Sequence, residues 1–299
     1  MKKTFHQIAL WEIVTISALA LLGLILGSFF DLQISKAIVD TNNSFGAFIE
    51  TYGATLGYGM IPIGGTLCFL GLFPRPRLWQ KLLGIFLVLL AIGLSSYLLG
   101  DSFTTSDTSY GFTVTSPFSY GLATLLMLLF SVFTIVLTDK RNLDLTLRIG
   151  VVIIVAILIQ YLIVTLFKSL NCRPRYRFIY DSNLNTENET FRAWYQFAPF
   201  KYHGDAHKSF PSGHTAQAGM VLLLASMSPI LRFRFKRCNY VLFGIGLIYT
   251  LLVAYSRIRY GAHFLSDVSV GLFIAVLSDF LSCYLLRFKE EKKNEVEVK

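Results

Sequence analysis

The run Ile149-Gly-Val-Val-Ile-Ile-Val-Ala-Ile-Leu-Ile-Gln-Tyr-Leu-Ile-Val-Thr-Leu-Phe167 decides the fold class of this chain. It holds no charged residue, and a helix of about 20 apolar residues is long enough to cross the ~30 Å hydrocarbon core of a membrane. The run also lacks the alternation of apolar and polar residues that is typical of a half-buried strand. It therefore predicts a membrane-spanning helix.

Similar runs recur along the whole chain. Of its 299 residues 54% are hydrophobic and only 15% are charged, against roughly 25% charged residues in an ordinary soluble domain. We expect about eight spans in an all-α, polytopic transmembrane helix bundle that forms a single integral membrane domain over residues 1–299. The expected spans cover about residues 9–30, 56–73, 82–100, 119–138, 149–167, 214–231, 239–256 and 264–286. The first is too long for the apolar part of a signal peptide, so we expect a retained helix.

The net charge of +9 follows the membrane topology rather than indicating a nucleic-acid partner. Most Lys and Arg residues lie near the two termini and in every second connection between spans, and such cationic loops stay in the cytoplasm. This pattern predicts that both termini lie in the cytoplasm. For a compact multi-pass protein with few cysteines, the plasma membrane is the expected location. The connections 31–55 and 101–118 hold a single cation, Lys36, and are expected outside.

Further cations lie in 168–212 and 257–263, which the same topology puts on the outer face. Because they run against the charge bias of membrane proteins, they indicate a site for an anion. For Arg177, Arg192, Lys201 and Lys208, the alternative that they only solvate a long loop stays open. That loop, 176–210, is long enough to be a functional lid or binding loop.

The four cysteines, Cys68, Cys172, Cys238 and Cys283, show no metal-ligand spacing. Three of them lie in or beside apolar runs, so we expect neither a disulfide framework nor a zinc site.

Three polar stretches carry the chemistry, and Ser256–Asp267 is the first of them. His263 and Asp267 are four residues apart, so on a helix they would share one face. The carboxylate could then accept a proton from one ring nitrogen and leave the other nitrogen as a nucleophile. A structural cap is the alternative. A turn is expected at Gly261, and it would bring Arg257 to the same depth in the membrane as His263. The planar guanidinium of Arg257 is suited to bind phosphate oxygens.

The second stretch, Pro211-Ser-Gly-His214, opens the sixth expected span. Ser212 could cap that helix, Gly213 would let a ligand approach the backbone, and the unpaired N–H groups there favour an anion. His214 could protonate a leaving oxygen as a general acid. An ordinary helix start with an interfacial histidine is the alternative.

The third stretch follows the fifth span and contains Lys168 and Arg175. Two cations there could neutralise the charge that a phosphoryl group spreads over its oxygens. Snorkelling towards the membrane surface is the alternative for each cation alone. Because the topology brings the ends of the fifth to eighth spans to one face, the conjunction of all three stretches indicates one site.

These motifs resemble those of the type 2 phosphatidic acid phosphatase superfamily of membrane lipid phosphatases. The family pattern is Lys-x6-Arg-Pro, Pro-Ser-Gly-His and Ser-Arg-x5-His-x3-Asp, and the resemblance covers about residues 165–270. Tyr176 stands where the family usually has Pro. The first motif can therefore be read through Arg175, which has the right distance from Lys168, or through Arg173, which precedes a proline. The resemblance implies a six-helix core, here with extra N-terminal helices.

The resemblance also implies a role for each matching residue. His263 would attack phosphorus and form a phosphohistidine, Asp267 would orient it, and His214 would protonate the leaving group and later activate water. No metal or other cofactor is implied, because cations would stabilise the phosphoryl charge. The residues expected to hold the phosphoryl oxygens are Lys168, Arg175, Ser212, Gly213 and Arg257.

The leading hypothesis is accordingly a phosphohydrolase of lipid phosphates or diphosphates, such as phosphatidate, phosphatidylglycerophosphate or a polyprenyl diphosphate. An anionic-lipid transporter or flippase is the main alternative, although its charged groups would be expected nearer the middle of the membrane. A phosphatase for a small soluble ester and a catalytically silent family member are the others.

Overall fold

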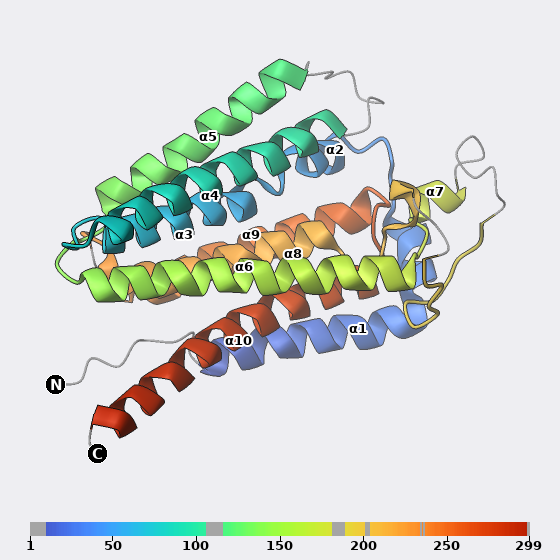
Figure 1. The fold of residues 1–299 in the computed structure, drawn as a ribbon. Helices are drawn as coiled ribbons and strands as arrows, with labels where there is room; N and C mark the ends of the chain where they lie inside the picture. Colours follow the sequence, from blue (N-terminus) through green and yellow to red (C-terminus); the bar gives the residue numbers. More distant parts are fainter. Residues whose placement is uncertain are drawn as a thin grey trace.

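A computed structural model describes residues 10–105, 116–180, 189–200, 204–233, 235 and 237–297. Within these residues the chain is a bundle of helices without a strand, which confirms the predicted all-α class. Figure 1 shows that the long helices run side by side along one direction.

The long helices coincide with the apolar runs. They are α1 (Leu10–Ile38), α3 (Thr55–Leu72), α4 (Leu78–Thr105), α5 (Ser116–Leu137), α6 (Leu143–Asn171), α9 (Cys238–Arg259) and α10 (Leu265–Glu297). The shorter elements are α2 (Ser44–Tyr52), α7 (Tyr176–Tyr180), α8 (Gly213–Gly219) and the 3₁₀ helices η2 (Asp205–His207) and η3 (Met220–Ile230).

Among the described residues seven helices are long and apolar enough to cross a membrane, which confirms a polytopic bundle. The sixth expected span differs, because residues 213–230 form α8 followed by η3 instead of one long helix. A 3₁₀ helix rises about 2 Å per residue against 1.5 Å in an α-helix. This composite segment therefore still covers about 30 Å with its 7 and 11 residues.

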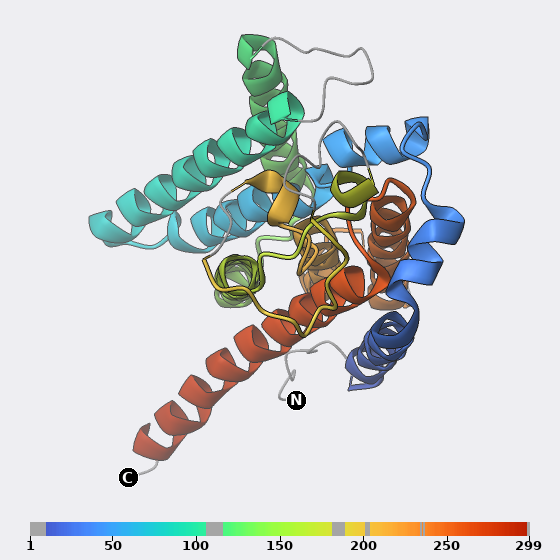
Figure 2. The same cartoon turned by 90° about the vertical axis from the view of Figure 1, so that its right-hand side faces the viewer.

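The core lies around this composite segment. Buried apolar side chains of α3, α6, η3 and α10 form the largest cluster, which includes Met60, Ile153, Met220 and Ala275. A second cluster joins α1 to η3, α9 and α10. In the end-on view of Figure 2, α4 and α5 lean away from the other helices, and they attach to the bundle mainly through α3.

Two glycines let neighbouring backbones approach the start of α8. A Cβ atom at Gly57 of α3 would lie 2.3 Å from the carbonyl oxygen of Gln217, and one at Gly271 of α10 would lie 2.6 Å from that of Ser212. Such small residues permit close helix packing in membranes. The segment that carries His214 is therefore held between α3 and α10.

Both termini of the described chain lie at one end of the bundle (Figure 1). The end of α6, the start of α8 and the turn between α9 and α10 lie at the opposite end, together with α2 and α7. The three polar stretches are therefore brought to one end of the molecule, as the loop charges predicted.

Candidate active site

Three backbone features direct the polar stretches towards one another. Cys172 ends α6 in the left-handed conformation (φ 48°), and its amide bonds back to the Lys168 carbonyl oxygen. Ser212 caps the start of α8 by accepting the amide of Thr215, as predicted. Gly261 has φ 69° between α9 and α10, which glycine adopts without steric cost and which confirms the predicted turn.

His263 lies at the centre of this region with 1% of its surface exposed. Its Nδ1 atom lies 2.6 Å from the carbonyl oxygen of Ser209. The nearest carboxylate oxygen of Asp267 is 3.9 Å from the same nitrogen, which is beyond hydrogen-bond distance. The expected direct bond from His263 to Asp267 is therefore wrong. Its premise fails because α10 begins only at Leu265, so the two residues do not share a helix.

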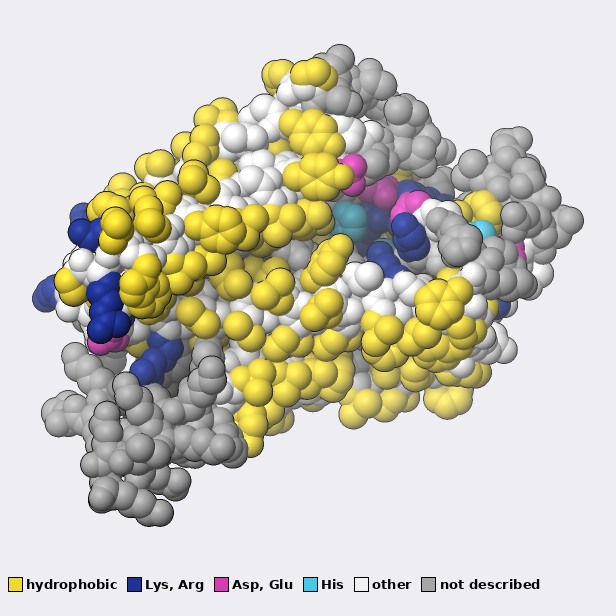
Figure 3. Space-filling model, viewed as in Figure 1, with side chains coloured by type: hydrophobic (Ala, Val, Ile, Leu, Met, Phe, Trp, Pro, Cys, Tyr) yellow, Lys and Arg dark blue, Asp and Glu magenta, His cyan; other side chains and the backbone are white. Residues whose placement is uncertain are grey.

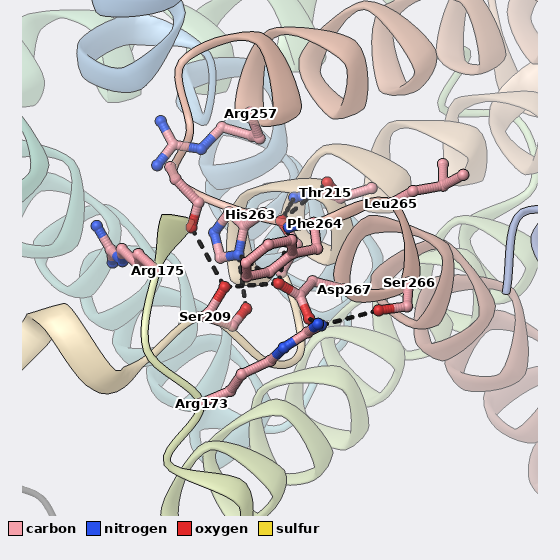
Figure 4. Close-up of polar contacts among 12 residues, drawn as sticks. Arg173, Arg175, Ser209, Thr215, Arg257, His263, Phe264, Leu265, Ser266 and Asp267 are labelled. Atoms are coloured by element: carbon pink, nitrogen blue, oxygen red, sulfur yellow. Dashed lines mark hydrogen bonds and ion pairs between the residues drawn. The ribbon is translucent and has the colours of Figure 1, made fainter. Parts of the chain in front are cut away.

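Asp267 instead holds the segments around His263. Its Oδ2 atom accepts hydrogen bonds from the Ser209 hydroxyl at 2.6 Å and from the Phe264 amide at 2.8 Å. Its Oδ1 atom accepts one from Arg173 Nη1 at 2.6 Å. Asp267 is fully buried, and Figure 4 shows these contacts converging on it below the imidazole. The carboxylate thus orients His263 through Ser209 and the first turn of α10.

Arg173 joins Asp267 to the N-terminal helix α1. Its Nη2 atom donates to Asp31 at 2.9 Å, and the Asp31 carboxylate also accepts the Ser266 amide at 2.9 Å. The guanidinium lies 4.0 Å from the centroid of the Phe264 ring, within the range of a cation–π contact. Arg173 and Asp31 are both buried. Arg173 therefore belongs to a buried ion network beneath His263.

Arg175 lies on a different side of the site. It pairs with Asp205 at 2.9 Å and approaches Glu50 at 3.9 Å. Its Nε atom is buried without a hydrogen-bond partner among the described residues. Of the two readings of the first motif, the geometry therefore favours Arg175 as the residue with donors left for a ligand, because the guanidinium of Arg173 is held by two carboxylates and a serine.

Arg257 is fully buried, and its Nη2 atom donates to Glu50 at 3.1 Å. Within the described chain its Nε and Nη1 atoms have no partner. Buried polar groups are almost always hydrogen-bonded, and guanidinium donors match the oxygens of a phosphate group. These donors, together with Nε of Arg175, can hold an anion in front of His263, as the arrangement in Figure 4 illustrates.

Lys168 and Gly213 also meet at this point. A Cβ atom at Gly213 would lie 3.3 Å from the Lys168 ammonium nitrogen, so the cation stands directly against the start of α8. Both residues are partly exposed. The lysine and the peptide N–H groups at this helix start can therefore both face a bound anion.

The surrounding cations act on His263 electrostatically. Burial lowers the pKa of His263 well below its ordinary value of 6.5, and the charges of Arg257, Arg175 and Lys168 lower it further. The imidazole is therefore neutral at physiological pH. Because the Ser209 carbonyl oxygen can only accept, the proton is on Nδ1 and Nε2 keeps a free lone pair.

His214 lies on the side of the site formed by α2. Its Nε2 atom is 3.2 Å from the backbone carbonyl oxygen of Glu50, and the residue is partly exposed. Ser212, by contrast, is buried with its hydroxyl 3.0 Å from that of Thr215. Its side chain serves as the helix cap, so a contact with phosphate from Ser212 stays a prediction.

Sequence reasoning missed five residues of the site: Asp31, Glu50, Arg173 as an ion-network residue, Asp205 and Ser209. One feature of the sequence could have identified Asp31 and Glu50, because both are carboxylates beside apolar spans on the predicted outer side. Two of the loop cations for which solvation alone was left open have partners in the structure. Arg177 binds Glu50 at 2.6 Å, and Arg192 donates to the Cys172 carbonyl oxygen. Lys208 is exposed, and Lys201 lies outside the described residues.

The site opens on the flank of the bundle. Figure 3 shows a largely apolar surface with cations at the end that holds the termini. At the opposite end, above α6 in this view, Lys or Arg, Asp or Glu and His side chains gather in a hollow. Among the described residues there is no group of three or more His, Cys, Asp or Glu that could hold a metal ion.

Comparison with protein families finds a match in the C-terminal part of the chain. Residues 149–291 match the model of the PAP2 superfamily, which confirms the resemblance inferred from the motifs. No curated protein and no solved structure matches the chain. The matched range includes all of α8, η3 and α9 and most of α6 and α10. It leaves Asp31 and Glu50 outside.

Proposed function

We propose that this protein, whose residues 149–291 match the model of the PAP2 superfamily, is a membrane phosphohydrolase that releases phosphate from lipid phosphates. The family suggests phosphatase activity on phosphate esters. The observation that carries the proposal is the neutral, buried His263 beside the unpartnered donors of Arg257 and Arg175.

In the first step Nε2 of His263 forms a bond to phosphorus as the bond from phosphorus to the ester oxygen breaks. His214 gives its proton to that oxygen, so the alcohol leaves uncharged. Arg257, Arg175 and Lys168 stabilise the charge on the phosphoryl oxygens throughout, as preorganised donors do in a dry site.

In the second step water attacks the phosphohistidine. His214, now neutral, takes a proton from this water, the bond between nitrogen and phosphorus breaks, and inorganic phosphate leaves. The Ser209 carbonyl oxygen supports both steps, because it keeps the proton on Nδ1 of His263 and stabilises the positive ring that phosphorylation creates.

A lipid substrate is supported by the position of the site on an apolar flank. The hollow in Figure 3 opens between apolar surfaces rather than only at the end of the bundle. Leu162 and Leu166, in the last turns of α6 before Lys168, are exposed and apolar, as expected for side chains that face lipid tails. A lipid head group could then reach the cations while its tail stays in the bilayer.

The loop charges support a position of this site on the outer face. Cations gather at the end that holds the termini (Figure 3), and the positive-inside rule would keep this end in the cytoplasm. The opposite end, with α2 and the three polar stretches, would then face the outside of the plasma membrane.

The test measures the inorganic phosphate that the purified protein releases from phosphatidate in mixed micelles with detergent. The wild type should release inorganic phosphate without any imposed gradient, whereas His263→Ala and His214→Ala should each lose activity by several powers of ten. A transporter would release none. Near-normal release by either variant would overturn the proposal. A soluble ester hydrolysed as well as phosphatidate would exclude the lipid as the preferred substrate.

A further inference from the structure

Glu50 is a buried carboxylate that α2 inserts among the cations of the site. Its Oε1 atom accepts Arg257 Nη2 at 3.1 Å, and its two oxygens accept both Nη atoms of Arg177 at 2.6 and 3.0 Å. Arg175 lies 3.9 Å away. Glu50 thus lowers the positive charge that this side of the site presents to a substrate.

The position of Glu50 relative to the two histidines shows which part of the site it lies in. Its backbone carbonyl oxygen lies 3.2 Å from Nε2 of His214, whereas Nδ1 of His263 contacts Ser209. In the proposed reaction His214 faces the leaving oxygen and His263 faces phosphorus. Glu50 therefore lies between Arg257, which its carboxylate binds, and His214, which its backbone contacts on the side where the leaving group departs.

We propose that Glu50 is a specificity-determining residue that selects a neutral leaving group over an anionic one, so that the enzyme prefers lipid monophosphates to lipid diphosphates. The inference rests on the proposed phosphohydrolase function. A monophosphate ester leaves as an alcohol, whereas a diphosphate leaves as a lipid monophosphate with its own negative charge. That charge would meet the Glu50 carboxylate.

The hydrogen-bond donors that have no partner in the site are enough for one phosphoryl group but not for two. Arg177 is bound to Glu50 through both of its Nη atoms. Nε and Nη1 of Arg257 and Nε of Arg175 have no partner among the described residues. These donors can serve the phosphoryl group that His263 attacks. A second phosphate beside His214 would lie close to an unfavourable like charge, and such interactions are strong where water is scarce.

The experiment compares farnesyl phosphate with farnesyl diphosphate, which share one apolar tail, as substrates of the full-length protein in detergent micelles. The wild type should show a kcat/KM at least about tenfold higher for the monophosphate. Glu50→Gln should shift the ratio about tenfold towards the diphosphate, because it removes the charge and keeps the shape. Glu50→Asp, which keeps the charge, should retain the preference.

Asp40→Asn is the matched control. Asp40 lies at the same end and pairs with Arg259 at 3.1 Å, so its loss changes the net charge equally without touching the site. A shift as large in Asp40→Asn, an unchanged ratio in Glu50→Gln, or a lost preference in Glu50→Asp would each overturn the inference. A wild type that prefers the diphosphate would overturn it even if Glu50→Gln does not fold. Failure of the proposed function is distinct, since the wild type would then hydrolyse neither compound.

Discussion

The Nδ1 atom of His263 is hydrogen-bonded to the backbone carbonyl oxygen of Ser209 at 2.6 Å. A backbone carbonyl cannot be lost by substitution and can only accept a proton, so this bond fixes one tautomer of the imidazole. Asp267 acts one step further away, through the Ser209 hydroxyl at 2.6 Å. The order of contacts is therefore carboxylate, serine, histidine, and it makes Ser209 a positioning residue.

Ser209→Ala should lower kcat about tenfold and leave KM nearly unchanged, because the variant keeps the carbonyl but frees the loop from Asp267. Asp267→Asn should cost more, about hundredfold or above, since Asp267 also accepts from Arg173 and from the Phe264 amide. Steady-state kinetics with phosphatidate measure both. Ser209→Thr, which restores the hydroxyl, should recover kcat. A loss confined to KM in Ser209→Ala would contradict the positioning role.

Arg173→Met and Arg175→Met should separate stability from activity. Removing Arg173 leaves Asp31 and Asp267 buried without a counter-ion, which typically costs about 3–5 kcal/mol. The thermal unfolding midpoint in detergent should therefore fall by about 10 °C. Arg175→Met removes the same charge, but it should unfold near the wild-type temperature and lose at least about tenfold in kcat/KM. Equal midpoints for the two variants would refute the distinction between the network beneath His263 and the cluster that faces the substrate.

The pH profile should report the lowered pKa of His263. Burial, assisted by Arg257, Arg175 and Lys168, favours the neutral ring. The nucleophile therefore stays active as the pH falls through the ordinary histidine value of 6.5, and the acid limb of kcat/KM should lie below that pH. Lys168→Met removes one of the charges and should move this limb upward. Comparing the two proteins on one substrate cancels ionisation of the substrate. A limb at or above 6.5 in the wild type, or a downward shift in the variant, would contradict this account.

Chelation should leave the activity unchanged. Three carboxylates of the site are each paired with an arginine, namely Glu50 with Arg257, Asp205 with Arg175 and Asp267 with Arg173. The cations that stabilise phosphate are then side chains of the protein. Phosphate release measured with and without excess EDTA should agree within experimental scatter. Inactivation by EDTA with recovery on added Mg²⁺ would require a metal and would refute this part of the mechanism.

Sequence patterns predicted what depends on local chemistry. The length of the apolar runs predicted the helical bundle, and the loop charges predicted that the three polar stretches lie at one end. Gly261 was correctly predicted as the turn before His263. The sixth span was mistaken for one long helix, because apolar length does not distinguish an α-helix from a 3₁₀ helix.

The rest depends on contacts between distant parts of the chain. The four-residue spacing of His263 and Asp267 suggested a direct bond, but that rule holds only where a helix is continuous. Ser209 takes the expected place of Asp267 because a loop far away in sequence packs against the turn before α10. Asp31 and Glu50 come from α1 and α2, and no spacing rule relates these helices to residues more than a hundred positions away.

Trapping of the covalent intermediate tests the central claim most directly. The purified protein is mixed with phosphatidate labelled with ³²P in its phosphate group, quenched in base within the first turnover, and digested for peptide mapping. The account predicts a base-stable, acid-labile phosphohistidine on the peptide that contains His263, present in the wild type and absent in His263→Ala. Label that persists in His263→Ala, or that maps to the peptide of His214, would contradict it.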